Sequence, residues 1–360
     1  MSGVEVGRQV VATAPVRIAD VGGWTDTWFG SPGRVCHVAV GPGVEVRASI
    51  VRRSPEGPVH LIAPDIGVDQ FVGPGGAPEA PTWATPRPGR HPLLEHAIAA
   101  VIGDVDLPAE LGIELHITSQ VPAGASLGTS AAVLVAVLGA LDALVAGGKR
   151  LPVELAVLAH QVETVRAGRE AGVQDQWAAA VGGVGLLAIG PYPEVRHEAI
   201  AMAPRAAAEL EDRLVTVVFG PHDSSLVHAQ VINAMVGCGG PEHDRARTAL
   251  RRLSTLAGDA AAALADGEID QWAEVLVAST EAQRDLHAGL IGPAHQAAID
   301  ASRSAGATGW KVNGAGGDGG SLTVVAAPGG RDAVEVALAD LDPTWRTMWL
   351  GPSAGFRIEA

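Results

Sequence analysis

Cysteine is nearly absent from this chain of 360 residues, which contains only Cys36 and Cys238. So few cysteines exclude a disulfide framework and a cysteine-based metal site. The twelve histidines do not occur in H-E-x-x-H or a similar zinc spacing. The sequence therefore predicts a fold that depends on its hydrophobic core, which a chain of this length can bury.

Positive charge is also scarce, because lysine occurs only at positions 149 and 311 and the formal net charge is −15. No basic run is present, so nucleic acids and anionic membranes are disfavoured as partners. The first six residues lack the basic start and apolar run of a signal peptide. The longest apolar run, residues 131–146, contains Asp142 and is short for a membrane span. We expect a cytoplasmic protein with small-molecule partners, for which a homodimer is one option.

Residues 121–132, Val-Pro-Ala-Gly-Ala-Ser-Leu-Gly-Thr-Ser-Ala-Ala, form a loop of small residues. Before it, residues 111–118 alternate apolar and polar side chains like a half-buried strand. After it, residues 130–145 are rich in Ala, Val and Leu and predict a buried helix. A strand, a glycine-containing loop and a helix start direct free backbone N–H groups and a positive helix end at one point. The loop is therefore expected to bind an anion, most often a phosphate.

Two named motifs compete for this loop. A P-loop is disfavoured because the lysine of G-x-x-x-x-G-K-[ST] is missing. Residues 124–128 match the G-x-S-x-G nucleophile elbow, which would make Ser126 a hydrolase nucleophile with Asp285 and either His287 or His295 as partners. Against this serine hydrolase, a proline and small residues separate the serine from the strand, and no His-Gly-Gly-Gly segment is present.

The loop resembles the phosphate-binding loop of the GHMP kinases, P-x-x-x-[GS]-L-G-[ST]-S-A, a family that includes galactokinase, homoserine kinase, mevalonate kinase and phosphomevalonate kinase. Ser126 stands where those enzymes usually have glycine, and a serine has less freedom than glycine at positive φ. The resemblance implies ATP as a cofactor. It assigns contacts with ATP to Pro122, Gly124, Ala125, Ser126, Leu127, Gly128, Thr129 and Ser130.

Residues 14–26, Ala-Pro-Val-Arg-Ile-Ala-Asp-Val-Gly-Gly-Trp-Thr-Asp, resemble the opening motif of the same family. Galactokinases have Glu-His where this chain has Gly23-Trp24, which favours the versions found in L-fucose kinases and heptose-phosphate kinases. A carboxylate beside a tryptophan suits a sugar, because the carboxylate accepts hydrogen bonds from hydroxyls and the ring covers the C–H face. The alternative is an Asp-capped turn with a core tryptophan. The resemblance implies substrate contacts from Gly22, Gly23, Trp24, Thr25 and Asp26.

Residues 311–322, Lys-Val-Asn-Gly-Ala-Gly-Gly-Asp-Gly-Gly-Ser-Leu, resemble the family's C-terminal G-A-G-G-G-G motif, with Asp318 replacing a glycine. They also satisfy G-x-G-x-x-G, but residues 321–327 predict a strand where a dinucleotide site needs a helix. A tight turn between two strands is the plainer alternative. The resemblance implies close packing against the phosphate loop and the substrate. Its candidate residues are Gly314, Gly316, Gly317 and Lys311, the last more readily explained as a strand-end lysine.

Residues 172–177, Gly-Val-Gln-Asp-Gln-Trp, resemble the G-x-x-D-Q segment that carries the catalytic aspartate in galactokinase and in the fucose and heptose kinases. Asp175 would then be the base, or the carboxylate that orients the attacking hydroxyl. Arg17 would stabilise developing charge or keep the aspartate ionised. The alternative for Asp175 is a helix N-cap.

Magnesium requires oxygen ligands and takes few of them from protein. Ser130 matches a family position that contacts the metal. Glu163 is the expected second ligand, although its spacing to Asp175 is one residue longer than the resemblance suggests. Glu170 competes with it, but neighbouring arginines make Glu170 look like part of a solvated helix face.

The resemblance implies a two-domain α+β fold with ATP and substrate in the cleft between the domains. The expected division is an N-terminal S5-like domain, residues 1–192, and a C-terminal ferredoxin-like domain, residues 193–360. The patterns predict strands over 8–13, 44–52, 58–63, 111–118, 213–219, 308–313, 321–327 and 354–358. They predict helices over 93–102, 128–146, 152–168, 174–181, three stretches of 241–305, and 330–341, with 68–92 as a Gly/Pro-rich connection.

These features together predict an ATP- and Mg²⁺-dependent sugar kinase. The subgroup likeness favours the C1 hydroxyl of a heptose or longer sugar phosphate, in nucleotide-sugar biosynthesis. A free-sugar kinase such as an L-fucose kinase is the alternative within the class. Outside the class, the alternative is a catalytically silent sugar or ATP sensor, in which the departures at Ser126 and Asp318 would weaken ATP binding.

Overall fold

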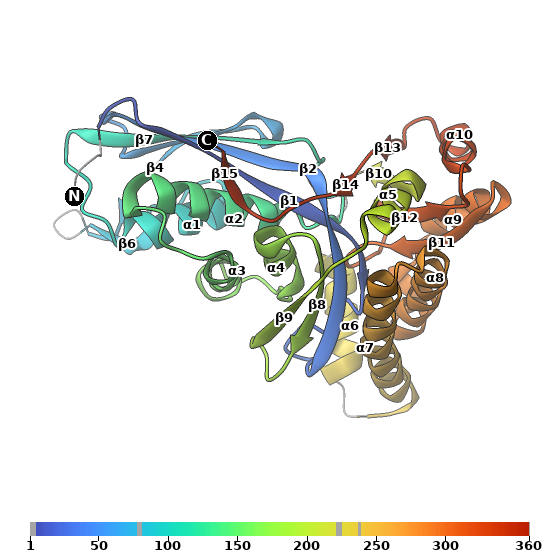
Figure 1. Ribbon diagram of the computed structural model, residues 1–360. Helices are drawn as coiled ribbons and strands as arrows, with labels where there is room; N and C mark the ends of the chain where they lie inside the picture. Colours follow the sequence, from blue (N-terminus) through green and yellow to red (C-terminus); the bar gives the residue numbers. More distant parts are fainter. Residues whose placement is uncertain (1–4, 78–80, 221–224, 237–238, 360) are drawn as a thin grey trace.

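The computed structural model describes residues 5–77, 81–220, 225–236 and 239–359, which form two main β-sheets covered by helices (Figure 1). Cys238 lies outside these ranges. The larger sheet contains β1 (Gln9–Val21), β2 (Gly33–Arg52), β3 (Val59–Ala63), β4 (Val68–Val72), β7 (Leu111–Ser119), β8 (Val184–Ile189), β9 (Val195–Ile200), β14 (Gly351–Pro352) and β15 (Arg357–Glu359). The smaller sheet contains β10 (Leu214–Gly220), β11 (Ala307–Val312), β12 (Gly320–Ala326) and β13 (Arg346–Met348), and β5 (Pro74–Gly75) pairs with β6 (Thr82–Pro86).

The helices of the described residues are α1 (Pro92–Ile102), α2 (Thr129–Leu141), α3 (Pro152–Gln161), α4 (Gln174–Val181), α5 (Pro204–Arg213), α6 (Ser225–Val236), α7 (Pro241–Asp266), α8 (Ile269–Leu286), α9 (Pro293–Ser304) and α10 (Arg331–Leu341). They include two runs with no strand between them, α2 to α4 and α6 to α9. Short 3-10 helices cover Pro64–Ile66 and Ala288–Leu290, and π-helical turns extend α2 over Asp142–Ala146 and α3 over Val162–Arg166.

Strand β2 determines where the site lies, because it is long enough to pair with different neighbours at its two ends. Residues 33–38 pair with β8 and residues 44–52 pair with β7, while β1 runs antiparallel along both parts. The end of β1 and the turn after it are thereby carried to the edge of the larger sheet that faces the C-terminal helices (Figure 1).

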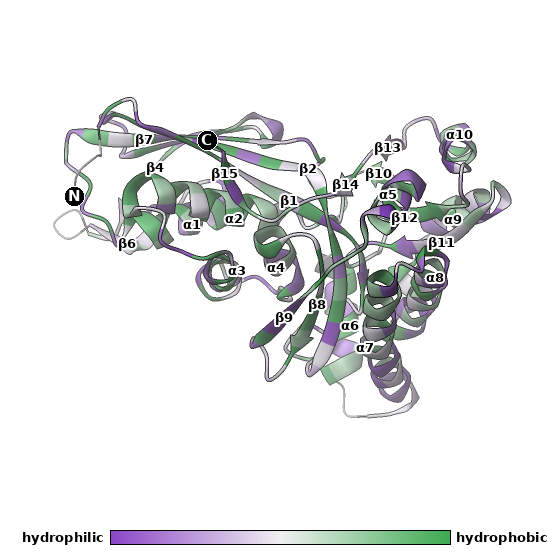
Figure 2. Cartoon of the chain, in the orientation of Figure 1, coloured by the Kyte–Doolittle hydropathy of each residue, from purple (hydrophilic) through white to green (hydrophobic). Residues whose placement is uncertain are grey.

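Helix α2 is the core helix of the N-terminal half. With its π-helical extension, Thr129–Ala146 is long and apolar enough to cross a membrane by length and composition, but 67% of it is buried inside the protein. Leu134 and Leu138 are fully buried, and the helix packs on β1 and β2. Figure 2 shows apolar residues dominating α1 and α2 beneath the sheet. Asp142 is tolerated in this helix because it pairs with Arg150 at 2.5 Å.

The C-terminal half has a separate core between the smaller sheet and helices α9 and α10, built on Val217, Leu322 and Val324. Helix α7 packs on both α8 and β2, so it joins the two halves. A third cluster, containing Trp24, Val231 and further apolar residues of α7 and α8, lies at this junction.

The predicted α+β class is confirmed, and most predicted strands and helices are present within a few residues. The assignment of 68–92 as a plain connection is wrong, because β4, β5 and β6 lie in it. The strands β8, β9, β13 and β14 and the helices α5 and α6 were not predicted either. Of these, β9 is a short edge strand that carries charged residues. The division at residue 192 stays a prediction; it falls within the β8–β9 hairpin, and β14 and β15 return to the larger sheet.

Candidate functional site

The loop before α2 has a backbone that suits an anion. Gly124, Ser126 and Gly128 all have positive φ, of 76°, 57° and 72°. Helix α2 begins at Thr129 with Gly128 as its N-cap, and no side chain caps it. The Thr129 hydroxyl is buried and has no hydrogen-bond partner among the residues that the structure describes. The first-turn N–H groups of α2 and this hydroxyl are therefore unsatisfied donors at a positive helix end, as phosphate oxygens require.

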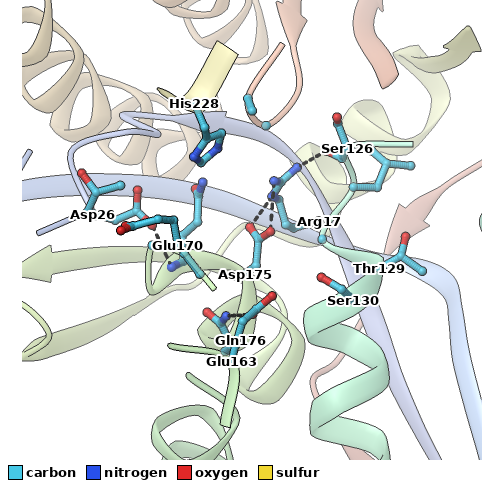
Figure 3. A pocket seen from close by; sticks show the side chains of 18 of the residues that line it. Arg17, Asp26, Ser126, Thr129, Ser130, Glu163, Glu170, Asp175, Gln176 and His228 are labelled. Atoms are coloured by element: carbon cyan, nitrogen blue, oxygen red, sulfur yellow. Dashed lines mark hydrogen bonds and ion pairs between the residues drawn. The ribbon is translucent and has the colours of Figure 1, made fainter. Parts of the chain in front are cut away.

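Arg17 connects the loop to the candidate catalytic aspartate. Its Nε donates to Asp175 Oδ1 at 2.8 Å, its Nη2 donates to Asp175 Oδ2 at 3.3 Å, and its Nη1 donates to the Ser126 carbonyl at 2.5 Å (Figure 3). Although burial lowers the pKa of Arg17, the charges of Asp175, Asp20 and Asp26 hold it above its usual value. The guanidinium is thus a fixed cation that holds Asp175 in a bidentate geometry.

Asp175 lies in the first turn of α4, where Val173 is the N-cap residue. The helix N-cap alternative for this aspartate is therefore wrong. Its side chain is 29% exposed, whereas that of Arg17 is 4% exposed. A Cβ on Gly128 would lie 3.2 Å from the Asp175 Cγ. The aspartate therefore faces the phosphate loop directly and remains open to a ligand.

Asp26 is held by a distant segment of the chain. Its Oδ2 accepts a hydrogen bond from the Gln174 backbone N–H at 3.0 Å, so the interpretation as an Asp-capped turn is wrong. The hydroxyls of Thr25 and Thr27 make the local turn bonds instead. Burial and the charges of Asp175 and Asp20 raise the pKa of Asp26 to about 6.

Trp24 belongs to both the core and the cleft. It is 5% exposed and packs among apolar residues of α6, α7 and α8, as the core-tryptophan alternative expects. Its ring lies 4.6 Å from that of His228, between centroids, and both residues line the same cleft. Its indole N–H is buried with no partner in the described part of the chain, and its φ is 80°. Such a conformation is costly for a bulky residue and is concentrated at functional sites.

Glu163 lies in the π-helical turn that extends α3. A π turn holds one residue more than an α turn, which accounts for the extra residue between Glu163 and Asp175. Gln176 Nε2 donates to Glu163 at 2.7 Å (Figure 3). Burial, followed by the charge of Asp175, raises the pKa of Glu163. Ser130 lines the same cleft. Within the described ranges, no group of three or more His, Cys, Asp or Glu side chains forms a metal site by itself.

The Gly-rich connection after β11 packs on the phosphate loop as predicted. The Gly314 N–H donates to Asp20 Oδ1 at 3.0 Å, and a Cβ on Gly314 would lie 3.0 Å from the Ser126 carbonyl oxygen. The strand β12 follows this connection, so the dinucleotide motif lacks its helix, as expected.

Lys311 is buried and does not line the cleft. Its side chain is 2% exposed, and its ammonium donates to Gln283 Oε1 at 2.9 Å and lies 3.9 Å from Asp20 Oδ1. Burial lowers the pKa of Lys311, while the charges of Lys311 and Arg17 lower that of Asp20 although its burial opposes this. The idea that Lys311 touches a substrate phosphate is therefore wrong for this arrangement: it supports Asp20 from behind the site.

These residues enclose a cleft of about 300 Å³ between the two halves. Of the predicted site residues, Arg17, Trp24, Asp26, Gly124, Ala125, Ser126, Leu127, Gly128, Thr129, Ser130, Glu163, Asp175 and Gly314 line it. Pro122, Gly22, Gly23, Thr25, Gly316, Gly317 and Lys311 do not. Two of these glycines pack closely against the backbone of distant segments instead: a Cβ on Gly22 would lie 2.1 Å from the Arg34 carbonyl oxygen, and one on Gly316 would lie 2.0 Å from that of Leu290.

Lining residues missed as substrate contacts are Thr27, Glu170, Ala171, Gly172, Gln174, Gln176, His228 and Ala315. The missed residues near Asp175 lie beside the motif of residues 172–177, which was identified from the sequence. No sequence pattern pointed to His228, because the helix that carries it, α6, was not predicted. The serine hydrolase is not assembled, since Asp285 pairs with Arg252, His295 bonds to Gly292, and neither they nor His287 line the cleft.

Comparison with known proteins agrees with this geometry. The family model described as the GHMP kinases N terminal domain matches residues 93–183. The mevalonate kinase of Thermococcus sibiricus is 30% identical over 221 residues, which is 58% of either chain. That of Pyrococcus horikoshii is 41% identical over 90 residues, 25% of this chain and 26% of the relative. The chain therefore covers 58% of the length of the first of these curated relatives and 26% of the second.

Solved structures match over nearly the whole chain. A D-glycero-D-manno-heptose 1-phosphate kinase from Bacteroides thetaiotaomicron has a TM-score of 0.72 at 20% identity and covers 98% of this chain and 99% of its own. Lactococcus lactis galactokinase complexed with galactose has a TM-score of 0.70 at 18% identity, covering 98% and 96%. The predicted GHMP kinase fold is thus confirmed. Residues 93–183 match the N-terminal domain of the GHMP kinases, and the chain as a whole has the fold of these enzymes.

Proposed function

We propose that this protein transfers the γ-phosphoryl group of Mg²⁺-bound ATP to a hydroxyl of a sugar. The observation that supports this most directly is the Arg17–Asp175 pair, which faces the uncapped N-terminus of α2 across one cleft (Figure 3). Phosphoryl transfer needs an aligned nucleophile and compensation of negative charge, with little covalent help from the protein.

Asp175 serves as the acceptor's base or orienting group. Its carboxylate is fixed by Arg17 and is partly open to the cleft, so it accepts a hydrogen bond from the attacking hydroxyl and receives its proton. The donors at the N-terminus of α2, with the Thr129 hydroxyl, bind phosphate oxygens. Gly128 has a positive φ and no Cβ, so its backbone can approach a phosphate closely. A Cβ at this position would lie against Asp175.

Ser130 and Glu163 fit a magnesium ion. Glu163 is a buried carboxylate whose hydrogen-bond partner within the described residues is the neutral Gln176, and hard oxygen ligands are what Mg²⁺ binds. A site with so few protein ligands depends on phosphate oxygens to complete its coordination. The ion would neutralise charge on the phosphates during transfer.

Asp26 and the Gly-Gly-Trp-Thr-Asp turn favour a sugar as the acceptor. The sequence resemblance favours the anomeric C1 hydroxyl of a heptose or of L-fucose, and the structural match to a heptose kinase is in keeping with that. Mevalonate is the second candidate, because the sequence relatives that match are mevalonate kinases, the first of them 30% identical over 221 residues.

The experiment is a coupled ADP-release assay with Mg²⁺-ATP and a panel of hexoses, heptoses and mevalonate. Asp175→Asn should lower kcat by on the order of a hundredfold or more, with the KM for ATP little changed. Asp69→Asn, which alters an exposed carboxylate on a distant strand, is the matched control. Ser126→Ala should have a modest effect. Loss of activity in Ser126→Ala with full activity in Asp175→Asn would contradict the kinase and restore the hydrolase.

A further inference from the structure

Resting on the proposed function, we infer that the acceptor is an uncharged polyol, a free sugar that carries neither a phosphate nor a carboxylate. The inference starts from the charges that line the cleft. Four carboxylates line it, those of Asp26, Glu163, Glu170 and Asp175, and the one Arg or Lys side chain among its described lining residues is Arg17.

The hydrogen-bond donors of Arg17 are already used within the protein. Each of its three guanidinium nitrogens bonds to Asp175 or to the Ser126 carbonyl, and the residue is 3% exposed. A second anion for this guanidinium would have to compete with a bidentate carboxylate. His228 adds no charge, because burial lowers its pKa.

Among the described residues that line the cleft, no other lysine or arginine could replace it. Lys311 is buried against Asp20, and Lys149 borders a separate surface pocket beside Asp142. The residues outside the described ranges contain no lysine or arginine. Arg169 precedes Glu170 but is exposed and does not line the cleft.

Magnesium and the helix N-terminus compensate the charge of ATP, but a second phosphate group would meet the carboxylates of Asp26 and Glu170. Like charges placed together in an interface repel each other strongly, so such a site rejects anions. Hydroxyl groups have the opposite preference, because carboxylate oxygens accept their hydrogen bonds.

The Glu170 side chain is held at the cleft by a hydrogen bond from Trp28. Its Oε2 accepts the indole N–H of Trp28 at 2.8 Å, and Trp28 is 45% exposed beside the cleft. An exposed indole beside a carboxylate suits the C–H face and hydroxyls of a sugar. The sugar phosphate favoured by sequence resemblance, and the carboxylate of mevalonate, are both disfavoured by these charges.

The test compares matched acceptor pairs: D-glycero-D-manno-heptose with its 7-phosphate, mannose with mannose 6-phosphate, and galactose with galactose 6-phosphate, with mevalonate as the carboxylate. ADP release and product mass are measured for each. For any accepted sugar we expect kcat/KM to be on the order of 100-fold higher for the free form than for its phosphate. A phosphate preferred over its free sugar, or turnover of mevalonate alone, would overturn this inference and leave the kinase intact.

Two variants make the charge argument independent of which sugar is found. Glu170→Arg should raise kcat/KM for the phosphate member of a pair about tenfold or more relative to the free member, whereas the matched Glu170→Gln should change that ratio far less. Arg47→Ala, which removes an exposed arginine of β2 that does not line the cleft, should leave the ratio unchanged. No shift in Glu170→Arg would contradict the inference. If no acceptor of either kind is phosphorylated while equilibrium dialysis shows ATP binding, the proposed function itself fails.

Discussion

Asp26 is a buried carboxylate that, within the described residues, forms no ion pair and accepts one backbone N–H. Burial raises its pKa to about 6, with help from the charge of Asp175. Below that pH the group is protonated and is a weaker acceptor for a substrate hydroxyl. We therefore expect kcat/KM to fall as the pH drops through about 6, and a pH profile of the wild type to show this acid limb. In Asp26→Asn the activity should be low and the limb absent; an unchanged limb would assign it to another group.

The same shift has a consequence for stability. In the unfolded chain Asp26 loses its proton near its ordinary pKa of 3.8, whereas the folded protein keeps it to about 6. The folded state therefore binds the proton more tightly, and the stability contributed by that proton is lost as the pH rises through this window. At pH 7 Asp26→Asn should be more stable by up to about 3 kcal/mol in urea unfolding, with no difference at pH 3. Equal gains at both pH values would contradict this account.

At the scale of elements, a helix can be predicted correctly from the sequence while the reason for one of its residues, here Gly139, stays hidden. The apolar run 130–145 predicted a buried helix interrupted by this glycine, and the helix is present. The interruption has a reason that lies at the other end of the chain: a Cβ on Gly139 would lie 2.2 Å from the Phe356 ring. Close packing between segments that are far apart in the sequence leaves no pattern in the residues around Gly139, so this contact could not be predicted.

Gly139→Ala tests that contact. Alanine favours a helix by up to about 1 kcal/mol over glycine, but here the clash with Phe356 should make the variant less stable by about 1–3 kcal/mol. Gly258→Ala in α7 is the matched control, because its Cβ would meet Arg34 at an ordinary 3.4 Å and should be neutral or stabilising. In urea unfolding, Gly139→Ala should cost less in a Phe356→Leu background, and additive effects would contradict the contact.

Whether a site residue could be predicted from the sequence depends on the element that carries it. The phosphate loop, Arg17, Asp26, Asp175 and Glu163 were found from local motifs and meet in one cleft. His228 and the burial of Lys311 were not, because both depend on how helices of the C-terminal half pack against the turn after β1. The assignment of Lys311 rested on its rarity, and rarity does not distinguish a ligand-binding cation from a buried structural one.

At the scale of the whole molecule, the chain crosses between its halves more than once, which the expected division at residue 192 does not suggest. After β13 the chain returns to the larger sheet: β14 pairs with β2, Ser353 bonds to Ala39 and Gly183, and β15 pairs with β1. The Phe356 N–H donates to the carbonyls of α4, the helix that carries Asp175. The C-terminal segment therefore supports the half that carries Asp175.

A chain ending at Trp349 should lose stability in the N-terminal half although only C-terminal residues are removed. We expect a lower Tm and, by hydrogen exchange, faster exchange in β1, β2 and α4, because their backbone partners are gone. The wild type should unfold in one transition, with tryptophan fluorescence and circular dichroism coinciding, since a shared apolar cluster and the returning strands join the halves. If truncation changed exchange only in the smaller sheet, the halves would be independent. The position of Asp175 against the phosphate loop would then rest on the N-terminal half alone, and Phe356→Leu would leave kcat unchanged.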